Sequence, residues 1–199
     1  ALTMIKTCKS VLQTKEYQYD NGLEESFYTD CLNKINSLGI IEELDDNELL
    51  LIYVKQCIHI MKKSGLIIIS NGTASISSEE LTDGMLYVKL FDTFWNHVEW
   101  KDIFPSDEVA ASELQLNKNI LIDILLKKKK KSRLEKIANE FFELTGFSFL
   151  NDIVMISFLD FYFFTWLRHF GVIKYYGNNY SPVSIEVTEK GKNLLSFVM

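Results

Sequence analysis

The chain has 199 residues, of which 47% are hydrophobic, and it contains 14 Phe, 9 Tyr and 3 Trp. This apolar and aromatic content excludes a disordered chain and is enough for a buried core without disulfide or metal staples. The formal net charge of −6 means that the molecule as a whole repels phosphate backbones, so any nucleic-acid contact would need a local basic patch.

The first half of the chain alternates helical patterns with one predicted hairpin. Apolar residues recur every three or four positions over residues 23–38, which indicates an amphipathic helix that ends near Gly39. A second helix is expected over residues 46–63, with acidic residues at its N-terminal end. The pair Asn71-Gly72 separates two short β-prone runs and predicts a hairpin, after which helical spacing returns over residues 81–100.

A break is predicted at Phe104-Pro105-Ser106, because the residue before a proline is pushed out of helical geometry. It divides the chain into two predicted domains, residues 1–105 and residues 106–199. Beyond the break, further helices are expected over residues 114–131 and 134–144.

The last quarter of the chain is the most apolar. An aromatic helix is expected over residues 153–170, and its apolar run is shorter than the roughly 20 residues that cross a bilayer, so no membrane association is expected. Gly171 ends this helix. A second hairpin is predicted over residues 172–187, with Gly177-Asn178 as its turn, and a short helix over residues 188–197.

A shift of the chain by 106 positions lays the pattern of the first half over that of the second. It places Gly65 on Gly171 and Thr82 on Thr188. The other superimposed positions are Ile52 with Phe158, Cys57 with Phe163, Ile58 with Phe164, Ile60 with Trp166, and Met61 with Leu167. Either a structural duplication or a chance coincidence of helical stripes explains the match, and the glycine followed by a hairpin is its more specific part.

The segment 166–173, with residues 180–187 and 188–195, resembles the end of many winged-helix domains. In that family a helix enters a leucine-glycine-aliphatic turn, followed by a two-stranded wing and a threonine-x-x-glycine start to the last helix. The pattern recurs more loosely at residues 61–85. The resemblance implies a compact three-helix core with a β-wing, often used on DNA. The expected fold is therefore mainly α with two small β-hairpins (α+β), arranged as tandem winged-helix-like repeats.

The chain departs from that family at the helix that would read DNA. A recognition helix presents Arg, Lys, Asn or Gln to base edges, whereas residues 158–170 offer mostly Phe, Tyr, Trp and Leu. The predicted wing, residues 174–184, carries Lys174 as its single basic residue. Such a helix is expected to be buried.

One basic run is the clearest candidate contact site. Its members are Lys127, Lys128, Lys129, Lys130, Lys131, Arg133 and Lys136. One interpretation is an electrostatic patch that contacts a nucleic-acid backbone or the acidic surface of a partner protein. The other is a solvated helix end and linker with no partner. The run lacks interleaved Asn, Gln or aromatic residues, so it predicts affinity without sequence specificity.

The other polar and thiol groups favour structural roles. The histidines His59, His97 and His169 are spread over separate helices, and no metal or cofactor is expected. The cysteines Cys8, Cys31 and Cys57 are an odd number without metal-ligand spacing, which indicates reduced core thiols in a cytoplasmic protein. Asp160 lies in the apolar helix and requires a partner, for which Arg168 or a helix end is expected.

An unusually aromatic stretch comprises Phe91, Phe94, Trp95 and Trp100. Core packing explains it, and an interface between repeats or between two chains is the alternative. We therefore expect a non-enzymatic, winged-helix-like binding module that acts through a protein partner or self-association. The alternative is a DNA-binding, transcriptional-regulator-like protein that uses the basic run 127–136. An enzyme whose site has no sequence signature is a third class.

Overall fold

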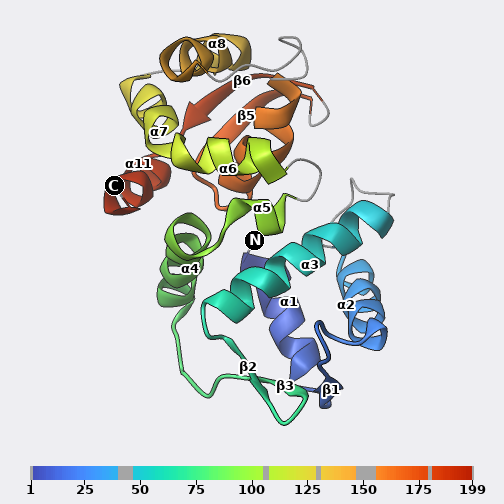
Figure 1. Ribbon diagram of the computed structural model, residues 1–199. Coiled ribbons are helices and arrows are strands. Elements are labelled where there is room, and N and C mark those ends of the chain that lie inside the picture. The colour runs from blue at the N-terminus through green and yellow to red at the C-terminus, as the bar shows by residue number, and fades with distance from the viewer. Residues whose placement is uncertain are drawn as a thin grey trace. The chain divides into compact units, whose positions relative to one another are not determined.

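A computed structural model describes residues 2–39, 47–104, 108–128, 131–146, 156–178 and 181–198. The described chain is mainly helical with two small antiparallel three-stranded sheets, which confirms the predicted α+β composition (Figure 1). It divides into two compact units: unit 1, Ala1–Val98, and unit 2, Glu99–Met199. The boundary predicted between residues 105 and 106 falls within residues 105–107, which lie outside the described residues, and it stays a prediction.

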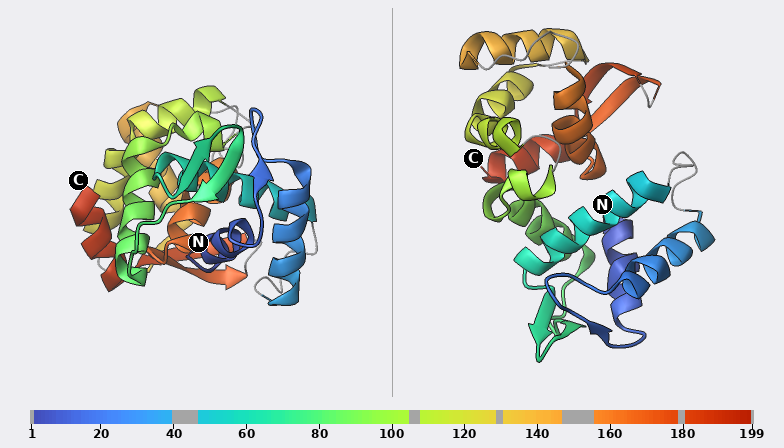
Figure 2. Two further views of the ribbon diagram at one scale, coloured as in Figure 1. Left: turned by 90° about the horizontal axis from the view of Figure 1, so that it is seen from below. Right: turned by 45° about the vertical axis from the view of Figure 1, so that its right-hand side comes forward.

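Unit 1 combines helices with one sheet. Its elements are α1 (Leu2–Leu12), β1 (Tyr17–Gln18), α2 (Glu25–Ser37), α3 (Asn47–Lys63), β2 (Ile67–Ser70), β3 (Thr73–Ile76), α4 (Asp83–Asp92) and the π-helix η1 (Thr93–His97). The strand order in the sheet is β1-β3-β2. The sheet lies at one end of helices α1, α2 and α3 (Figure 2).

The core of unit 1 lies where α1, α2 and α3 pack against one another. Each helix contributes one cysteine, and the thiols of Cys8, Cys31 and Cys57 have no exposed surface. Burial raises the pKa of the Cys57 thiol to about 12. The burial of all three side chains confirms the predicted packing of the cysteines in the core.

Helix α2 follows its predicted stripe except at the last position. Phe27, Cys31 and Ile35 are buried, as their spacing indicates. Leu38 is 57% exposed, because the helix ends at Ser37 and the stripe no longer applies. Gly39 follows with a φ of +58°, a value that glycine adopts without strain.

The first predicted hairpin is confirmed. Strands β2 and β3 pair from Ile67 with Ile76 to Ser70 with Thr73, which leaves Asn71-Gly72 as the two-residue turn. These two residues have φ values of +51° and +73°. A hairpin turn of this length favours positive φ at both central residues, and Asn-Gly supplies it at the lowest cost.

Unit 2 also combines helices with one sheet. Its elements are α5 (Trp100–Ile103), α6 (Glu108–Leu116), α7 (Lys118–Lys127), β4 (Ser132–Arg133), α8 (Leu134–Thr145), the π-helix η2 (Leu159–Phe164), α10 (Thr165–His169), β5 (Ile173–Asn178), β6 (Ser181–Val187) and α11 (Glu189–Val198). The strand order is β4-β6-β5. Strands β5 and β6 confirm the second predicted hairpin, but the predicted turn was wrong, because Gly177 and Asn178 belong to β5 and pair with Pro182 and Ser181.

Two of the predicted helices are divided in the structure. The helix expected over residues 114–131 is split at Asn117, whose φ of −99° and ψ of 7° separate α6 from α7. The helix expected over residues 81–100 ends earlier, because Val98 and Glu99 adopt extended backbone before α5 begins. Apolar spacing runs through both breaks and therefore does not reveal them.

In both units, the helix that precedes the hairpin ends in the same way. Gly65 and Gly171, 106 positions apart, have φ values of +72° and +65°. The residue after each glycine donates a backbone hydrogen bond back to the helix: Leu66 N to Met61 O at 2.9 Å, and Val172 N to Leu167 O at 2.8 Å. This is the glycine-terminated helix end that satisfies carbonyls left unpaired by the last turn.

The shift of 106 positions also matches caps and burial. Thr82 accepts from the Met85 N–H at the start of α4, and Thr188 accepts from the Gly191 N–H at the start of α11. The pairs in which both residues are buried are Cys57 with Phe163, Ile58 with Phe164, Ile60 with Trp166, and Met61 with Leu167. The remaining predicted pair differs, because Ile52 is 43% exposed while its counterpart on the second helix is buried.

Candidate functional site

The two units carry different charge balances. Unit 1 contains eight lysines and no arginine against 14 acidic residues, whereas in unit 2 13 basic residues balance 13 acidic ones. The formal net charge of −6 therefore belongs to unit 1. The basic run lies in unit 2, where no surplus of acidic residues opposes it.

The first part of the basic run forms the C-terminal end of α7, which favours cations. Lys127 is exposed, and Lys128 is half-buried with its ammonium paired to the carboxylate of Glu140 on α8. Lys129 and Lys130 lie outside the described residues. Part of the positive charge of the run is thus neutralised within the unit.

Strand β4 places Arg133 on a sheet, and Lys131 directly precedes this strand. Arg133 pairs with Ser184 of β6, and Ser184 pairs in turn with Tyr176 of β5, so these side chains project from the same face. The ammonium of Lys131 lies 4.2 Å from the centre of the Tyr176 ring. Lys174, two positions before Tyr176 on β5, shares this face and is exposed. We call Lys131, Arg133, Lys174 and Tyr176 the basic face.

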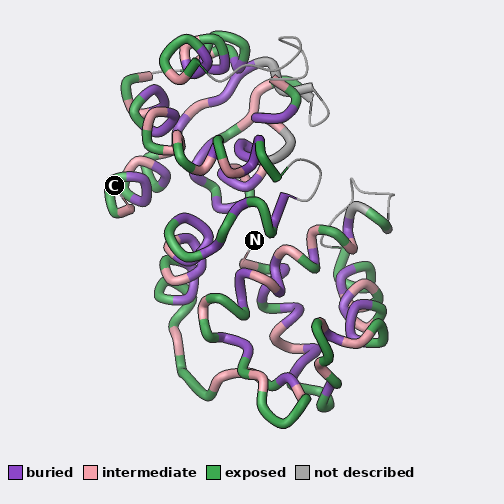
Figure 3. Tube along the Cα trace, viewed as in Figure 1, coloured by how far each residue is buried: buried purple, intermediate pink, exposed green. Residues whose placement is uncertain are grey.

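Lys136 does not belong to the basic face. It lies in the first turn of α8, on the exposed side of a helix whose other side is buried (Figure 3). The structure therefore brings together only part of the predicted set. The described members of the basic run lie at the end of α7, on or next to β4, and on α8.

Acidic side chains border the basic face. The guanidinium of Arg133 lies 3.3 Å from the carboxylate of Glu135. The hydroxyl of Tyr176 donates to the carboxylate of Glu186, and this hydrogen bond raises the pKa of the tyrosine. Glu186 is also the register partner of Lys174. The face can contact an anion, and the bordering carboxylates weaken its positive potential.

Two residues of the basic face, Lys174 and Tyr176, do not belong to the basic run that the sequence indicates. Lys174 and Tyr176 are separated from Lys131 by more than forty positions and meet it only through pairing of β4 with β6. The available signal was the alternation along β5, which places every second residue on one face. Strand β4 has two residues and carries no detectable period of its own.

The helix that leads into the second hairpin is packed inward, as predicted. Phe163, Phe164 and Trp166 are at most 2% exposed. Arg168 is half-exposed, with its guanidinium carbon 5.2 Å from the centre of the Tyr175 ring. The aromatic side chains of this helix therefore serve the core of unit 2. The side chain of Phe161 lies outside the described residues.

Asp160 has a partner that the sequence did not indicate. The Tyr175 hydroxyl donates a 2.6 Å hydrogen bond to its carboxylate. Burial raises the pKa of Asp160, and the hydrogen bond and the charge of Arg168 act in the opposite direction. The expected partner, Arg168, thus contributes through its charge, and Tyr175 supplies the hydrogen bond.

The aromatic stretch around residue 95 lies in the cores. Phe91, Phe94, Trp95 and Trp100 have no exposed surface. Phe91 stacks on Trp95 with ring centres 6.0 Å apart, and Trp100 lies 5.4 Å from Phe163 within unit 2. Such burial is what core packing requires, and the alternative, an interface between repeats or between two chains, stays a prediction.

Across the described ranges, no helix is long and apolar enough to cross a membrane, and no group of three or more His, Cys, Asp or Glu side chains is arranged to hold a metal ion. His59, His97 and His169 lie on α3, η1 and α10 respectively. Comparison of the chain with protein-family models, with curated proteins and with solved structures finds no match.

Proposed function

We propose that the protein is a non-enzymatic, tandem winged-helix-like module that acts by binding another protein or a second copy of itself. Both units support this proposal because they contain the element order helix, strand, helix, helix, strand, strand, helix. In unit 1 this order runs from α1 to α4, and in unit 2 it follows α5 and α6 and runs from α7 to α11, with η2 and α10 taken as one continuous helix. In both sheets the first strand pairs with the third, in the orders β1-β3-β2 and β4-β6-β5. Two units with one order and one strand pairing are what a tandem repeat requires.

The burial of the helix before the second hairpin carries the preference for a protein partner. In a DNA-reading winged helix this element presents polar side chains to base edges. Here Phe163, Phe164 and Trp166 turn into the core, and the bordering carboxylates reduce the charge of the basic face. This arrangement supports contact through the surface of the folded units instead of insertion of this helix into a groove.

Two measurements on the purified chain test the proposal. Sedimentation velocity at rising protein concentration reports self-association, and fluorescence anisotropy of a labelled mixed-sequence duplex reports DNA binding. We expect no duplex binding at physiological salt, because specific readout is missing and the net charge is negative. A tight association with the duplex that falls steeply with salt would contradict the proposal.

A second candidate function is DNA binding through the run 127–136, and the basic face favours it. Lys131, Arg133 and Lys174 lie on one side of a single sheet, as a surface that follows a phosphate backbone requires. If the chain binds duplex DNA this way, replacing any one of them with Gln lowers the slope of log K against log salt by about 0.9. Lys190→Gln on α11 is the matched control and leaves the slope unchanged.

A further inference from the structure

The two units differ at the connection between hairpin and last helix. In unit 1 the hairpin closes with Ser77 N donating to Leu66 O at 2.9 Å, and in unit 2 with Thr188 N donating to Val172 O at 2.9 Å. The shift of 106 positions places Ser77 five residues before Thr188, so the hairpin of unit 1 is shorter. The last helices, α4 and α11, nevertheless begin 106 positions apart, as the shift predicts. The positions that belong to the longer hairpin in unit 2 correspond in unit 1 to a separate connection, residues 77–82, between the hairpin and α4.

This difference changes how the last helix packs. In unit 2, α11 approaches the base of the hairpin so closely that a Cβ atom on Gly191 would overlap the Val172 carbonyl. Thr188 reinforces the contact by donating from its hydroxyl to Gly171 O at 2.8 Å. Met85, which lies 106 positions before Gly191, is 56% exposed instead. The longer connection of unit 1 thus leaves space where unit 2 has direct packing.

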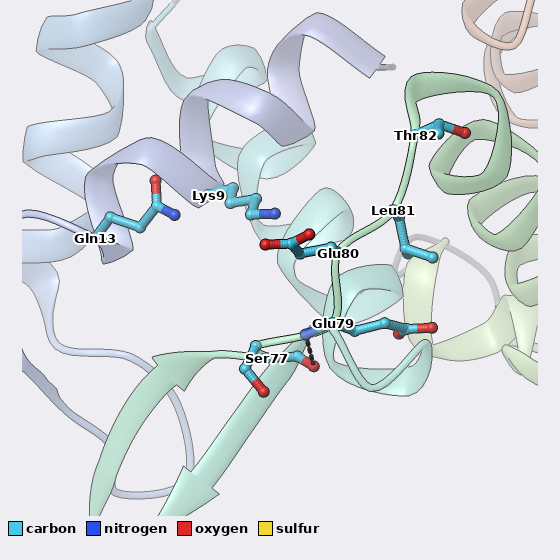
Figure 4. Close-up of a pocket in the computed structure, with 8 residues that line it drawn as sticks. Lys9, Gln13, Ser77, Glu79, Glu80, Leu81 and Thr82 are labelled. Atoms are coloured by element: carbon cyan, nitrogen blue, oxygen red, sulfur yellow. Dashed lines mark hydrogen bonds between the residues drawn. The ribbon is translucent and has the colours of Figure 1, made fainter.

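A groove of about 530 Å³ lies along this connection. One wall is α1 with the turn that follows it, which contribute Lys9 and Gln13, and the other is the connection itself, residues 77–82 (Figure 4). The groove is lined mainly by polar side chains. It belongs entirely to unit 1.

The backbone of the connection is available for pairing. Residues 77–82 form no helix, strand or turn, and the side chains of residues 78–80 are exposed. Within the described chain, no backbone hydrogen bond engages Ser78, Glu80 or Leu81, while Glu79 N donates to the Ser77 hydroxyl at 3.2 Å. A segment with unpaired N–H and C=O groups is a template for an added strand, and Thr82 at its end has an extended backbone, with a φ of −63° and a ψ of 160°.

The side chains favour a cationic ligand. Glu79 is held by Lys89 at 2.5 Å, so Glu80 is the carboxylate that remains in the groove. Lys9 and Glu80 point toward one another there (Figure 4). Unit 1 carries the whole negative net charge of the chain, which attracts basic segments over distances of about a Debye length.

We propose that this groove binds an extended, basic peptide segment of a partner protein, which pairs with the backbone of residues 77–82 and places a Lys or Arg side chain on Glu80. In the complex, the cation of the ligand lies beside the Glu80 carboxylate, which Lys9 faces in the free protein. This inference rests on the proposed protein-binding function and names its site. The recognition element is then the connection 77–82, which is the segment where unit 1 differs from unit 2.

The proposal predicts opposite effects for two single substitutions. Glu80→Gln removes the carboxylate that binds the cation and weakens binding by about threefold, the scale of an exposed ion pair. Lys9→Gln removes the competing ammonium and strengthens binding by about as much. Glu25→Gln, on the exposed first turn of α2, makes the same charge change as Glu80→Gln outside the groove and leaves affinity unchanged.

The experiment uses the full chain and a capped peptide of alternating valine and arginine, with an alternating valine and glutamate peptide as its control. Calorimetry gives the affinity, and amide hydrogen exchange gives the location. We expect binding of the basic peptide only, with new protection at residues 77–82. No binding of the basic peptide, equal binding of the acidic one, unchanged exchange at 77–82, or affinity changes of the same sign for Lys9→Gln and Glu80→Gln would overturn the proposal.

Failure of this site and failure of the proposed function give different results. If the groove is wrong but the protein associates with a second copy of itself, the sedimentation experiment still shows association while exchange at residues 77–82 stays unchanged. If the proposed function is wrong and the chain binds DNA, the duplex produces the salt-dependent anisotropy change. In that case replacements on the basic face, and not Glu80→Gln, alter the response.

Discussion

The Tyr175 hydroxyl on β5 donates a 2.6 Å hydrogen bond to the carboxylate of Asp160 in η2. This bond joins the helix before the second hairpin to the hairpin itself. Thr165 adds a bond from its hydroxyl to the Asp160 carbonyl at 2.9 Å. The side chain and the backbone of Asp160, in the first turn of the π-helix, thus both accept hydrogen bonds, which is how an ionisable group is accommodated in an aromatic segment.

Replacement of Asp160 tests the electrostatics of this site. Burial raises its folded-state pKa, so the folded protein holds the proton more tightly than the unfolded chain does. The unfolding free energy therefore falls as pH rises from the ordinary aspartate value of 3.8 through the raised folded pKa. Asp160→Asn should remove this pH dependence and be no less stable than the parent at pH 7. Urea unfolding of both proteins across pH checks it, and a stability difference, parent minus variant, that grows as pH rises over the same interval would contradict the assignment.

Replacement of Tyr175 tests the other partner. Tyr175→Phe leaves a partly buried carboxylate without its donor, and we expect a loss of about 1–3 kcal/mol in unfolding free energy at pH 7. The loss should shrink when Asp160→Asn is already present, because the two residues are directly coupled. A double-mutant cycle by urea unfolding measures the coupling. Additive effects would show that the bond contributes nothing.

Glycine substitutions test the different packing of the two last helices. Gly191→Ala should destabilise the protein by about 1–3 kcal/mol, because its Cβ overlaps the Val172 carbonyl. Gly84→Ala in α4 meets no atom within 4 Å, so it should stabilise by roughly 0.5–1 kcal/mol through better helix propensity. Thermal unfolding measures both. Equal effects would mean that α11 does not approach the hairpin closely.

The two capping threonines should differ in importance. Thr188 bonds both the Gly191 N–H and the Gly171 carbonyl, each at 2.8 Å, whereas Thr82 makes a longer bond of 3.3 Å to the Met85 N–H. Thr188→Ala should cost about 2 kcal/mol and Thr82→Ala about 0.5–1 kcal/mol. Serine at each position should recover most of the loss. The reverse order of costs, measured by chemical unfolding, would refute this comparison.

The cysteines should be unreactive in the native protein. Cys8, Cys31 and Cys57 are fully buried, and burial raises the pKa of Cys57 to about 12, so little thiolate forms near neutral pH. An aromatic disulfide reagent should label them at the rate of unfolding and rapidly only in denaturant. Rapid stoichiometric labelling of the native chain would show that the three-helix core of unit 1 is open.

Local turn chemistry made the first hairpin predictable, whereas the second was predicted with its turn at the wrong place, because Gly177 and Asn178 pair within it. Asn71-Gly72 specifies a two-residue turn, and Gly65 and Gly171 mark helix ends because their positive φ values suit glycine. The burial of the aromatic helix was also predictable, since its apolar residues leave no polar face. These features depend on residues close together in the chain.

Features that depend on pairing between distant segments could not be predicted. Strands β1 and β4 have two residues each, too few for an alternating pattern, and they exist through pairing with β3 and β6. The basic face follows from that pairing, because it brings Lys131 to Tyr176. The groove follows from where a hairpin closes, and helical periodicity carries no information on this.

The inward packing of the helix before the second hairpin is the basis for preferring a protein partner, and Trp166 on α10 reports it directly. The chain has three tryptophans, so Trp95→Phe with Trp100→Phe leaves Trp166 as the sole emitter. Its side chain is 2% exposed, so acrylamide should quench its fluorescence far less in the folded protein than in urea. Equal quenching in a variant that circular dichroism shows to be folded would place this helix at the surface and contradict the account.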